Sequence, residues 1–290
     1  MVQRQFGVST RLYRHQRLTR DHVFEIAAHG FETVELFAMR THLDYHNPSV
    51  VADLQQWLAE ARVELHGVHA PLSDPFINRP GEYMSIASAD AKARGHAVAE
   101  VERALQIARR IPLKVFVLHL GWPRTHKGFG GSNRDAARRS VEELIGIADP
   151  LGVRIAVEVI CNDLSRPGSL VDFAEEDLES GDMGICLDFG HAHLEGDLVD
   201  AIEVVSGHLA SIHIHDNHGR TDDHLVPFEG TIDWAAAMTA LQKVGYDGGL
   251  IFELASRGPA RDTLVRARAA RRRMENLIKA EGQGQGAKGY

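Results

Sequence analysis

The segment SIHIHDNHGRTDDHLVPFEGTIDW (residues 211–234) gathers side chains that can bind a metal ion. It holds four histidines and four aspartates in twenty-four positions. Imidazole and carboxylate ligands in combination suit Mg²⁺, Mn²⁺, iron, Co²⁺ and Zn²⁺. A solvated polar loop can have the same composition, so the segment alone leaves both interpretations open.

Further candidate ligands lie inside or next to apolar segments elsewhere in the chain. Glu158 interrupts AVEVI and Glu253 interrupts IFEL. Burial of a glutamate in such a strand carries a large free-energy penalty unless the carboxylate is paired or bound to a metal. A histidine at the end of an apolar segment is weaker evidence, because a local hydrogen bond usually explains it. The other candidates are His69, His119, Asp188, His191, His213, Asp222 and His224.

Eight strand-like segments are expected to position these residues. They are rich in valine, isoleucine, leucine and phenylalanine with little alternation, which is typical of strands covered on both faces. Eight helical patterns follow them in strict alternation, some with a capping residue such as Asp21 or Asn133 at the start. The strands are predicted at residues 6–10, 33–38, 65–70, 114–120, 154–160, 184–190, 209–215 and 249–254. The helices are predicted at residues 21–30, 47–62, 88–110, 132–152, 169–177, 197–208, 233–245 and 261–280.

This alternation predicts one α/β domain, a single (β/α)8 TIM barrel over residues 1–280. The chain length of 290 residues agrees, since such barrels commonly have ~250 residues. A doubly wound open sheet is the alternative, but eight regular strand–helix units favour closure. The Gly-rich end EGQGQGAKGY (residues 281–290) is expected to be a disordered tail.

In a TIM barrel the carboxyl ends of all strands meet at one rim, where active sites are built. Six of the eight predicted strands end in a candidate ligand or carry one near that end, and Glu35 in the second strand is an outlier. Cys186 lies two residues before Asp188, on the same side of its strand but deeper, so no thiolate is placed to bind. The coincidence predicts a metal site at the rim.

Bulk composition argues against other classes of function. The net charge of −8 provides no general basic field for nucleic acid. Two cysteines, Cys161 and Cys186, are too few for a disulfide framework and fit a reducing compartment. The first residues contain no apolar signal segment, and no apolar run is long enough to span a membrane. We therefore expect a cytoplasmic protein without membrane association.

Several motifs resemble the xylose isomerase-like superfamily of TIM barrels. They are GVHAP, VLHLG, VEVI, CLDFGHAHLEGD, HIHDNHG, DDHLVPFEGTIDW and IFEL, and together they span almost the whole chain. The combination is specific for the superfamily but not for one reaction. Two of its branches matter here, the sugar isomerases and epimerases and the apurinic endonucleases.

Resemblance to sugar isomerases, keto-sugar 3-epimerases and inosose enzymes implies a site for one divalent metal, Mn²⁺, Mg²⁺, Co²⁺ or Zn²⁺. A sugar, polyol or inosose substrate would lose a proton next to its carbonyl and form a metal-stabilised enediolate. Glu158 and Glu253 would be the catalytic base and acid, and His191 would bind a substrate oxygen. The implied metal ligands are Glu158, Asp188, His213 and Glu253.

Resemblance to apurinic endonucleases implies instead a phosphodiesterase that acts on DNA and holds up to three zinc ions. The sequence departs from that branch after Glu158, where it reads VICNDLS, and after His119, where it reads LGWPRTHKGFG. The isomerase or epimerase branch is therefore favoured, and the additional donors could contact substrate instead of metal. Matching residue types nevertheless fill all nine ligand positions: His69, His119, Glu158, Asp188, His191, His213, Asp222, His224 and Glu253.

Two more residues are candidate substrate contacts. Trp122 follows the fourth strand and could stack on a sugar face, although a plain lid residue would have the same placement. Arg220 could meet an anionic group, although a solvated side chain is the commoner case. The resemblance also allows a homo-oligomer, for which the sequence itself shows no interface.

Overall fold

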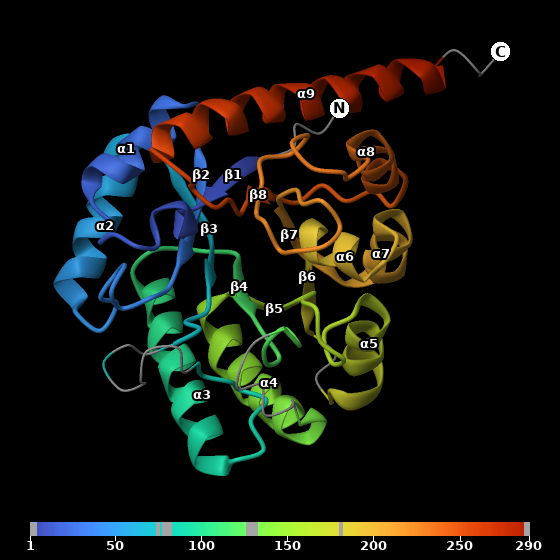
Figure 1. Ribbon diagram of the computed structural model, residues 1–290. Coiled ribbons are helices and arrows are strands. Elements are labelled where there is room, and N and C mark those ends of the chain that lie inside the picture. Colours follow the sequence, from blue (N-terminus) through green and yellow to red (C-terminus); the bar gives the residue numbers. More distant parts are fainter. Residues whose placement is uncertain (1–4, 74–75, 77–82, 126–132, 180–181, 287–290) are drawn as a thin grey trace.

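Eight parallel strands close into one barrel, in chain order from β1 to β8, in a computed structural model of the protein (Figure 1). It describes residues 5–73, 76, 83–125, 133–179 and 182–286, with side chains as far as residue 279. The strands are β1 (Phe6–Ser9), β2 (Thr33–Phe37), β3 (Glu64–His69), β4 (Val115–Leu118), β5 (Arg154–Glu158), β6 (Gly184–Asp188), β7 (Leu209–Ile214) and β8 (Leu250–Phe252). The predicted (β/α)8 barrel is confirmed, and the open-sheet alternative is wrong.

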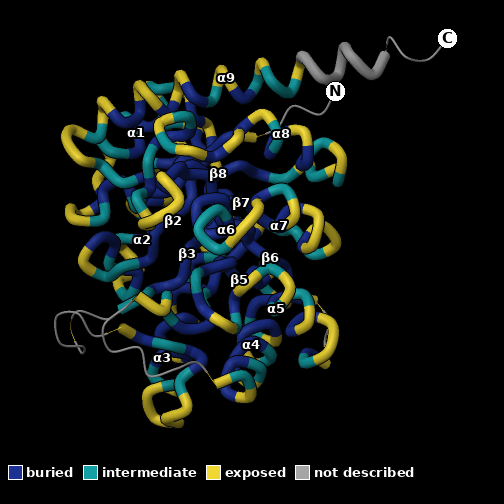
Figure 2. The backbone as a smooth tube through the Cα atoms, turned by 45° about the vertical axis from the view of Figure 1, so that its right-hand side comes forward, coloured by how far each residue is buried: buried dark blue, intermediate teal, exposed yellow. Residues whose placement is uncertain are grey.

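Helices surround the barrel as an outer layer, with their exposed residues turned away from it (Figure 2). Side-chain caps fix several starts: Asn133 accepts from the N–H of Ala136 at 2.8 Å, and Asp233 accepts from that of Ala236 at 3.0 Å. The helices are α1 (Arg20–Ala28), α2 (Pro48–Ala61), α3 (Ala91–Leu105), α4 (Arg134–Ala148), α5 (Pro167–Asp172), α6 (Phe189–Glu195), α7 (Leu198–Val205), α8 (Trp234–Lys243) and α9 (Ala260–Gly286).

The strands are buried on both faces, as their composition indicates. A large apolar core fills the space between strands and helices, and a second cluster of Val115, Val117, Ala156 and Cys186 is separate from it. Because side chains alternate along a strand, Glu158 shares a face with Ala156, and Asp188 shares one with Cys186. The second cluster therefore fills the barrel interior beneath the carboxylates, as predicted for Cys186.

Helix α6 is the main departure from the predicted elements. Phe189 and Gly190 were expected to extend the sixth strand, but they begin α6. The strand ends because Asp188 caps the helix, its Oδ1 accepting from the backbone N–H of His191 at 2.7 Å. At the other end of the chain, α9 continues through Gly286, and residues 287–290 lie outside the described residues, so the disordered tail remains a prediction.

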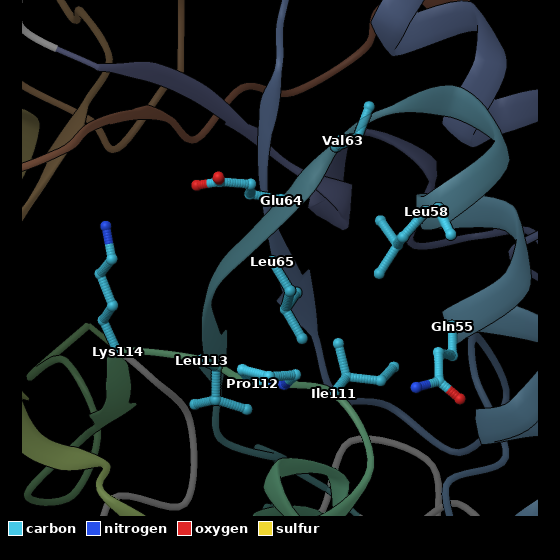
Figure 3. A pocket seen from close by; sticks show the side chains of 10 residues that line it. Gln55, Leu58, Val63, Glu64, Leu65, Ile111, Pro112, Leu113 and Lys114 are labelled. Carbon is cyan, nitrogen blue, oxygen red and sulfur yellow. The ribbon is translucent and has the colours of Figure 1, made fainter.

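A pocket of about 440 Å³ opens where β3 and β4 begin, between these strands and α2 (Figure 3). Leu58, Leu65 and Ile111 supply apolar side chains, and Glu64 and Lys114 contribute charges. This is the amino-terminal end of the barrel, the end that ordinarily serves stability rather than catalysis. Within the described residues, no helix has the length and apolar character needed to cross a membrane.

Candidate metal centre

Three groups of donor residues lie at the carboxyl ends of the strands and in the loop after β7, and all of them except His119 and Asp222 are buried. In each group the donor atoms all lie within 4.8 Å of one another. We call them the central group (Glu158, Asp188, His213 and Glu253), the β3–β4 group (His69, His119 and Glu158) and the β6–β7 group (His191, His215, Asp222 and His224). All nine residues singled out from the sequence are thus brought together, with His215 as a tenth.

Glu158, at the end of β5, belongs to two of these groups. Its Oε2 lies 3.1 Å from Nε2 of His119 and 3.2 Å from Nε2 of His69. Its Oε1 lies 3.6 Å from Nδ1 of His213 and 3.6 Å from Nδ1 of His191. The two oxygens therefore face different histidines, and one carboxylate would contribute a ligand atom to each of two donor groups.

Strand register aligns the central group. Asp188 on β6 is the partner of His213 on β7, so the two side chains stand at the same level of the barrel. Glu253 follows β8, and its Oε2 lies 4.0 Å from Nδ1 of His213. Both carboxylates and the imidazole are almost fully buried. A cation among them would be shielded from water by the protein.

Three histidines are held in one tautomer by backbone carbonyls. The Nδ1–H of His69 donates to Ala70 at 2.9 Å, that of His191 to Val159 at 3.1 Å, and that of His224 to Glu253 at 2.8 Å. When the ring is neutral, this leaves the lone pair on Nε2. Each of these Nε2 atoms points at a carboxylate oxygen, at distances of 3.2, 3.4 and 3.0 Å respectively.

His213 has the opposite arrangement. Its Nε2–H donates to Oε2 of Glu35, and its buried Nδ1 has no hydrogen-bond partner among the described residues. When the ring is neutral, as a metal ligand must be, the Nδ1 lone pair faces the oxygens of Glu158 and Glu253. In metal sites, a ligating histidine usually donates a hydrogen bond from one ring nitrogen and binds the metal with the other. The histidines here have this arrangement, and their second nitrogens lie about 3–4 Å from carboxylate oxygens that could bind the same ion. The donor sets thus fit divalent metal ions, although they do not identify the element.

Electrostatics keeps the carboxylates ionised. Burial acts to raise the pKa of Glu158, but the charges of His119 and His213 outweigh it and hold that pKa well below its ordinary value. Burial also opposes ionisation of Glu253, whose pKa is nevertheless lowered to about 2, chiefly by Arg11 and then by His224. Both glutamates are therefore anionic at neutral pH and available to bind a cation or accept a proton.

The loop after β7 is held in place by Asp216, which is fully buried. Its side chain accepts from the N–H groups of Phe228 at 2.9 Å and Ile232 at 3.2 Å, and from the indole of Trp234 at 2.8 Å. Its backbone also pairs with that of Leu225 in both directions, at 2.8 and 2.9 Å. The polar segment 211–234 is therefore an ordered loop that holds Asp222 and His224 over the rim.

His215 is a donor that sequence reasoning missed. Its Nε2 lies 2.9 Å from Oδ1 of Asp188 and 3.7 Å from Oδ1 of Asp222. The signal was present, because His215 stands two positions after His213 and so shares its face of the chain. Gly190 makes room for it, since a Cβ atom at that position would lie 1.9 Å from the imidazole ring.

Arg11 is a second residue that was missed, because it lies in the short 3-10 turn η1 (Thr10–Tyr13) after β1. Its Nε is 3.4 Å from Oε1 of Glu253. Glu35, considered only an outlier in the sequence, contacts the central group through His213.

The two predicted substrate contacts differ in placement. Trp122 lies beside the β3–β4 group, with its ring centroid 6.2 Å from that of His119 and its indole N–H donating to Met84 at 3.1 Å. Arg220 is exposed in the loop after β7, and among the described residues its guanidinium forms no ion pair with the donor groups. The structure thus brings Trp122, but not Arg220, next to the donors.

Comparison with known proteins agrees with this architecture. The family described as "Xylose isomerase-like TIM barrel" matches residues 23–277. An uncharacterised protein of Methanocaldococcus jannaschii is 28% identical over 256 residues, which cover 86% of this chain and 83% of the relative. An inosose isomerase of Bacillus velezensis is 22% identical over 239 residues, covering 78% of this chain and 79% of the relative.

A solved structure of a D-tagatose 3-epimerase-like protein superimposes with a TM-score of 0.79 at 26% sequence identity, and the match covers 96% of this chain and 99% of that chain. The family match extends from α1 into α9 and therefore includes every strand from β2 to β8. On this evidence the chain belongs to the xylose isomerase-like TIM barrel family.

Proposed function

We propose that this protein is a divalent-metal-dependent isomerase or epimerase that acts on a sugar or a polyol-derived carbonyl compound such as an inosose. The observation that carries the proposal is that two buried, ionised glutamates, Glu158 and Glu253, stand in one four-residue donor group. Relatives described as an inosose isomerase and a D-psicose 3-epimerase, each 22% identical, support the same reaction class.

Glu158, Asp188, His213 and Glu253 would hold the metal. When bound, a divalent ion supplies Lewis acidity that polarises a carbonyl and stabilises negative charge on oxygen. Mn²⁺, Mg²⁺, Co²⁺ and Zn²⁺ all accept this combination of ligands. A cytoplasmic location is part of the same proposal, and the free thiols of Cys161 and Cys186 agree with a reducing compartment.

The protein residues perform the proton transfers. One glutamate removes the proton from the carbon next to the carbonyl, so that the C–H electrons move toward the carbonyl oxygen. For epimerisation, the other glutamate takes a proton from solvent and delivers it to the opposite face of that carbon, while the first glutamate releases its proton to solvent. For isomerisation, the glutamate that took the proton delivers it to the former carbonyl carbon, and the proton of the neighbouring hydroxyl passes to the former carbonyl oxygen. His191, whose Nε2 points toward the rim residue Asp222, would bind a substrate hydroxyl. Trp122 would pack beside the sugar.

Exchange of substrate hydrogen with solvent tests this directly. We expect the protein with bound metal to incorporate deuterium from D₂O into at least one member of a panel of ketoses and inososes, next to the carbonyl. Glu158→Gln and Glu253→Gln should abolish exchange, while Glu64→Gln, a change at the exposed start of β3, should not. A panel in which no compound exchanges at high enzyme concentration would overturn the proposal.

A zinc phosphodiesterase is the second candidate, favoured by one observation. All nine predicted ligands fall into three adjacent groups, and Glu158 is common to two of them. Plasma mass spectrometry of protein purified without added metal separates the candidates in part. Two to three zinc ions per chain together with cleavage of an abasic duplex would establish the phosphodiesterase, and an intact duplex at high enzyme concentration would exclude it.

A further inference from the structure

Two arginines, Arg11 and Arg14, stand on the same side of turn η1. A 3-10 helix has three residues per turn, so side chains at positions i and i+3 eclipse each other. Arg14 continues the turn, because its backbone N–H donates to the carbonyl of Arg11 at 3.0 Å. Leu12 and Tyr13 between them are buried in the core. The packing of these two residues therefore leaves both guanidinium groups on the other side of the turn.

Arg11 reaches the central group with donor capacity to spare. Its Nε contacts Glu253 at 3.4 Å, and its side chain is only 14% exposed. The Nη1 atom of the same guanidinium is buried and has no hydrogen-bond partner among the described residues. An unpaired donor at such a position is unfavourable, so a ligand that supplies an acceptor there would be stabilised.

Arg14 adds a second positive charge on the same side of the turn. It is half-buried, and its Nε contacts the ring of His15 at 3.0 Å. Burial and the neighbouring charge of Arg11 lower the pKa of Arg14, whereas the charges of Glu253 and Asp222 act to raise it. The guanidinium of Arg14 therefore lies within electrostatic reach of Arg11 and of the rim carboxylates. An anion between the two arginines would relieve their mutual repulsion.

We propose that Arg11 and Arg14 form an anion-binding subsite for the phosphate group of a phosphorylated sugar. The identification of the sugar as substrate rests on the proposed isomerase function. A phosphate monoester offers three strong acceptor oxygens, enough to accept from the unpaired Nη1 of Arg11 and from the guanidinium of Arg14 at once, whereas a carboxylate offers two. Guanidinium forks bind phosphate oxygens bidentately. Since Arg11 contacts Glu253, the phosphate is held next to the central group, where the carbonyl end reacts.

Two arginines in other rim loops, Arg124 and Arg220, do not combine burial with an unpaired guanidinium donor. Arg124 is already paired with Asp163 at 2.9 Å and Glu195 at 2.6 Å. Arg220 is exposed in the loop after β7. Arg124 is therefore a suitable control, because its replacement removes the same charge from the same protein without altering the subsite.

Calorimetric titration with inorganic phosphate tests the subsite in the protein with its bound metal. We expect Arg11→Ala and Arg14→Ala each to weaken phosphate binding by about 10-fold or more, the usual loss for a hydrogen bond to a charged group. Arg124→Ala should bind phosphate like the wild type. D-Gluconate is titrated in parallel as a carboxylate probe and should bind more weakly than phosphate.

Metal content measured on every variant separates the subsite from a purely structural role. If Arg11 only holds Glu253 in position, Arg11→Ala changes metal content, and Arg14→Ala leaves phosphate affinity intact. This pair of results would overturn the proposal. So would equal phosphate affinity in all variants, an absence of phosphate binding by the wild type, or tighter binding of gluconate than of phosphate. The titration requires no turnover, so arginine-dependent phosphate binding stands even if deuterium exchange shows the isomerase proposal to be wrong.

Discussion

Oε2 of Glu35 on β2 lies 2.8 Å from Nε2 of His213 on β7, and both side chains are fully buried. The contact joins two strands that are not neighbours in the barrel, so it crosses the interior. A carboxylate on one imidazole nitrogen fixes the tautomer and makes the other nitrogen a better metal ligand. Glu35 is therefore a positioning residue for the central group, although it lies outside all three donor groups.

Glu35→Gln should lower the affinity of the protein for its divalent metal by roughly 10–100-fold, the usual effect of losing such a partner. The cause is the loss of negative charge that makes His213 more basic. Competition with a chromogenic chelator measures the affinity. Glu64→Gln serves as the control because Glu64 is exposed. Equal affinities for wild type and Glu35→Gln would mean that Glu35 has no influence on the ligand.

Removal of metal should destabilise the fold. The central group holds three buried carboxylates whose donor atoms lie within 4.8 Å of one another, and a bound cation would offset the repulsion that Arg11 and the histidines leave uncompensated. A metal present at 100 times its Kd contributes about 2.7 kcal/mol, which corresponds to a Tm shift of about 4–5 °C in a domain of this size. Differential scanning calorimetry with and without chelator measures the shift. In Asp188→Asn, which lacks one ligand charge, the chelator should lower Tm by less. If the chelator leaves the Tm of the wild type unchanged, no stabilising metal was bound.

Gly190→Ala should displace His215. The added methyl would lie 1.9 Å from one ring atom of His215, so the ring must move. We expect a loss of roughly 1–3 kcal/mol in the free energy of unfolding, typical of overpacking, and a lower metal stoichiometry. Gly146→Ala in α4 is the control, since nothing lies within 4 Å of its new methyl and alanine favours a helix. Wild-type stability and stoichiometry in Gly190→Ala would contradict the tight packing at this site.

His42 should make stability depend on pH. Burial lowers its pKa from 6.5 to about 4, and its Nδ1–H donates to Gln16 at 2.7 Å. The folded pKa lies below the unfolded one, so the unfolded chain binds the proton more readily. The contribution of neutral His42 to the free energy of unfolding is therefore complete above pH 6.5. It is lost as the pH falls toward 4 and amounts to roughly 3 kcal/mol. His42→Asn keeps a donor for Gln16 but cannot titrate, so urea unfolding should show a flatter pH profile; parallel profiles would refute this assignment.

The fold could be predicted because its signals are local and repeated. Each strand is a short apolar run, each helix has its own periodicity, and parallel strands must place their carboxyl ends at one rim. That geometry is sufficient to bring Glu158 and His213, fifty-five positions apart in the sequence, into one group.

What escaped prediction depends on where loops and turns direct a side chain. Arg11 lies in a turn after β1, and nothing in STRLYR indicates that its guanidinium reaches Glu253 across the barrel closure. His215 is a ligand candidate only because α6 starts at Phe189 and Gly190 leaves space for the ring. Glu35 contacts His213 across the barrel interior, from a strand that is not a neighbour of β7, and no local pattern in the sequence indicates that pairing.

Glu158 also affects how the centre would fill. Because its two oxygens face different donor groups, an ion bound on one side alters the charge and orientation that the other side presents. If both groups bound an ion, their occupancies would be thermodynamically linked, and each ion would change the affinity of the other by the same factor. The number of ions per chain would follow the free metal concentration as well as the ligand set.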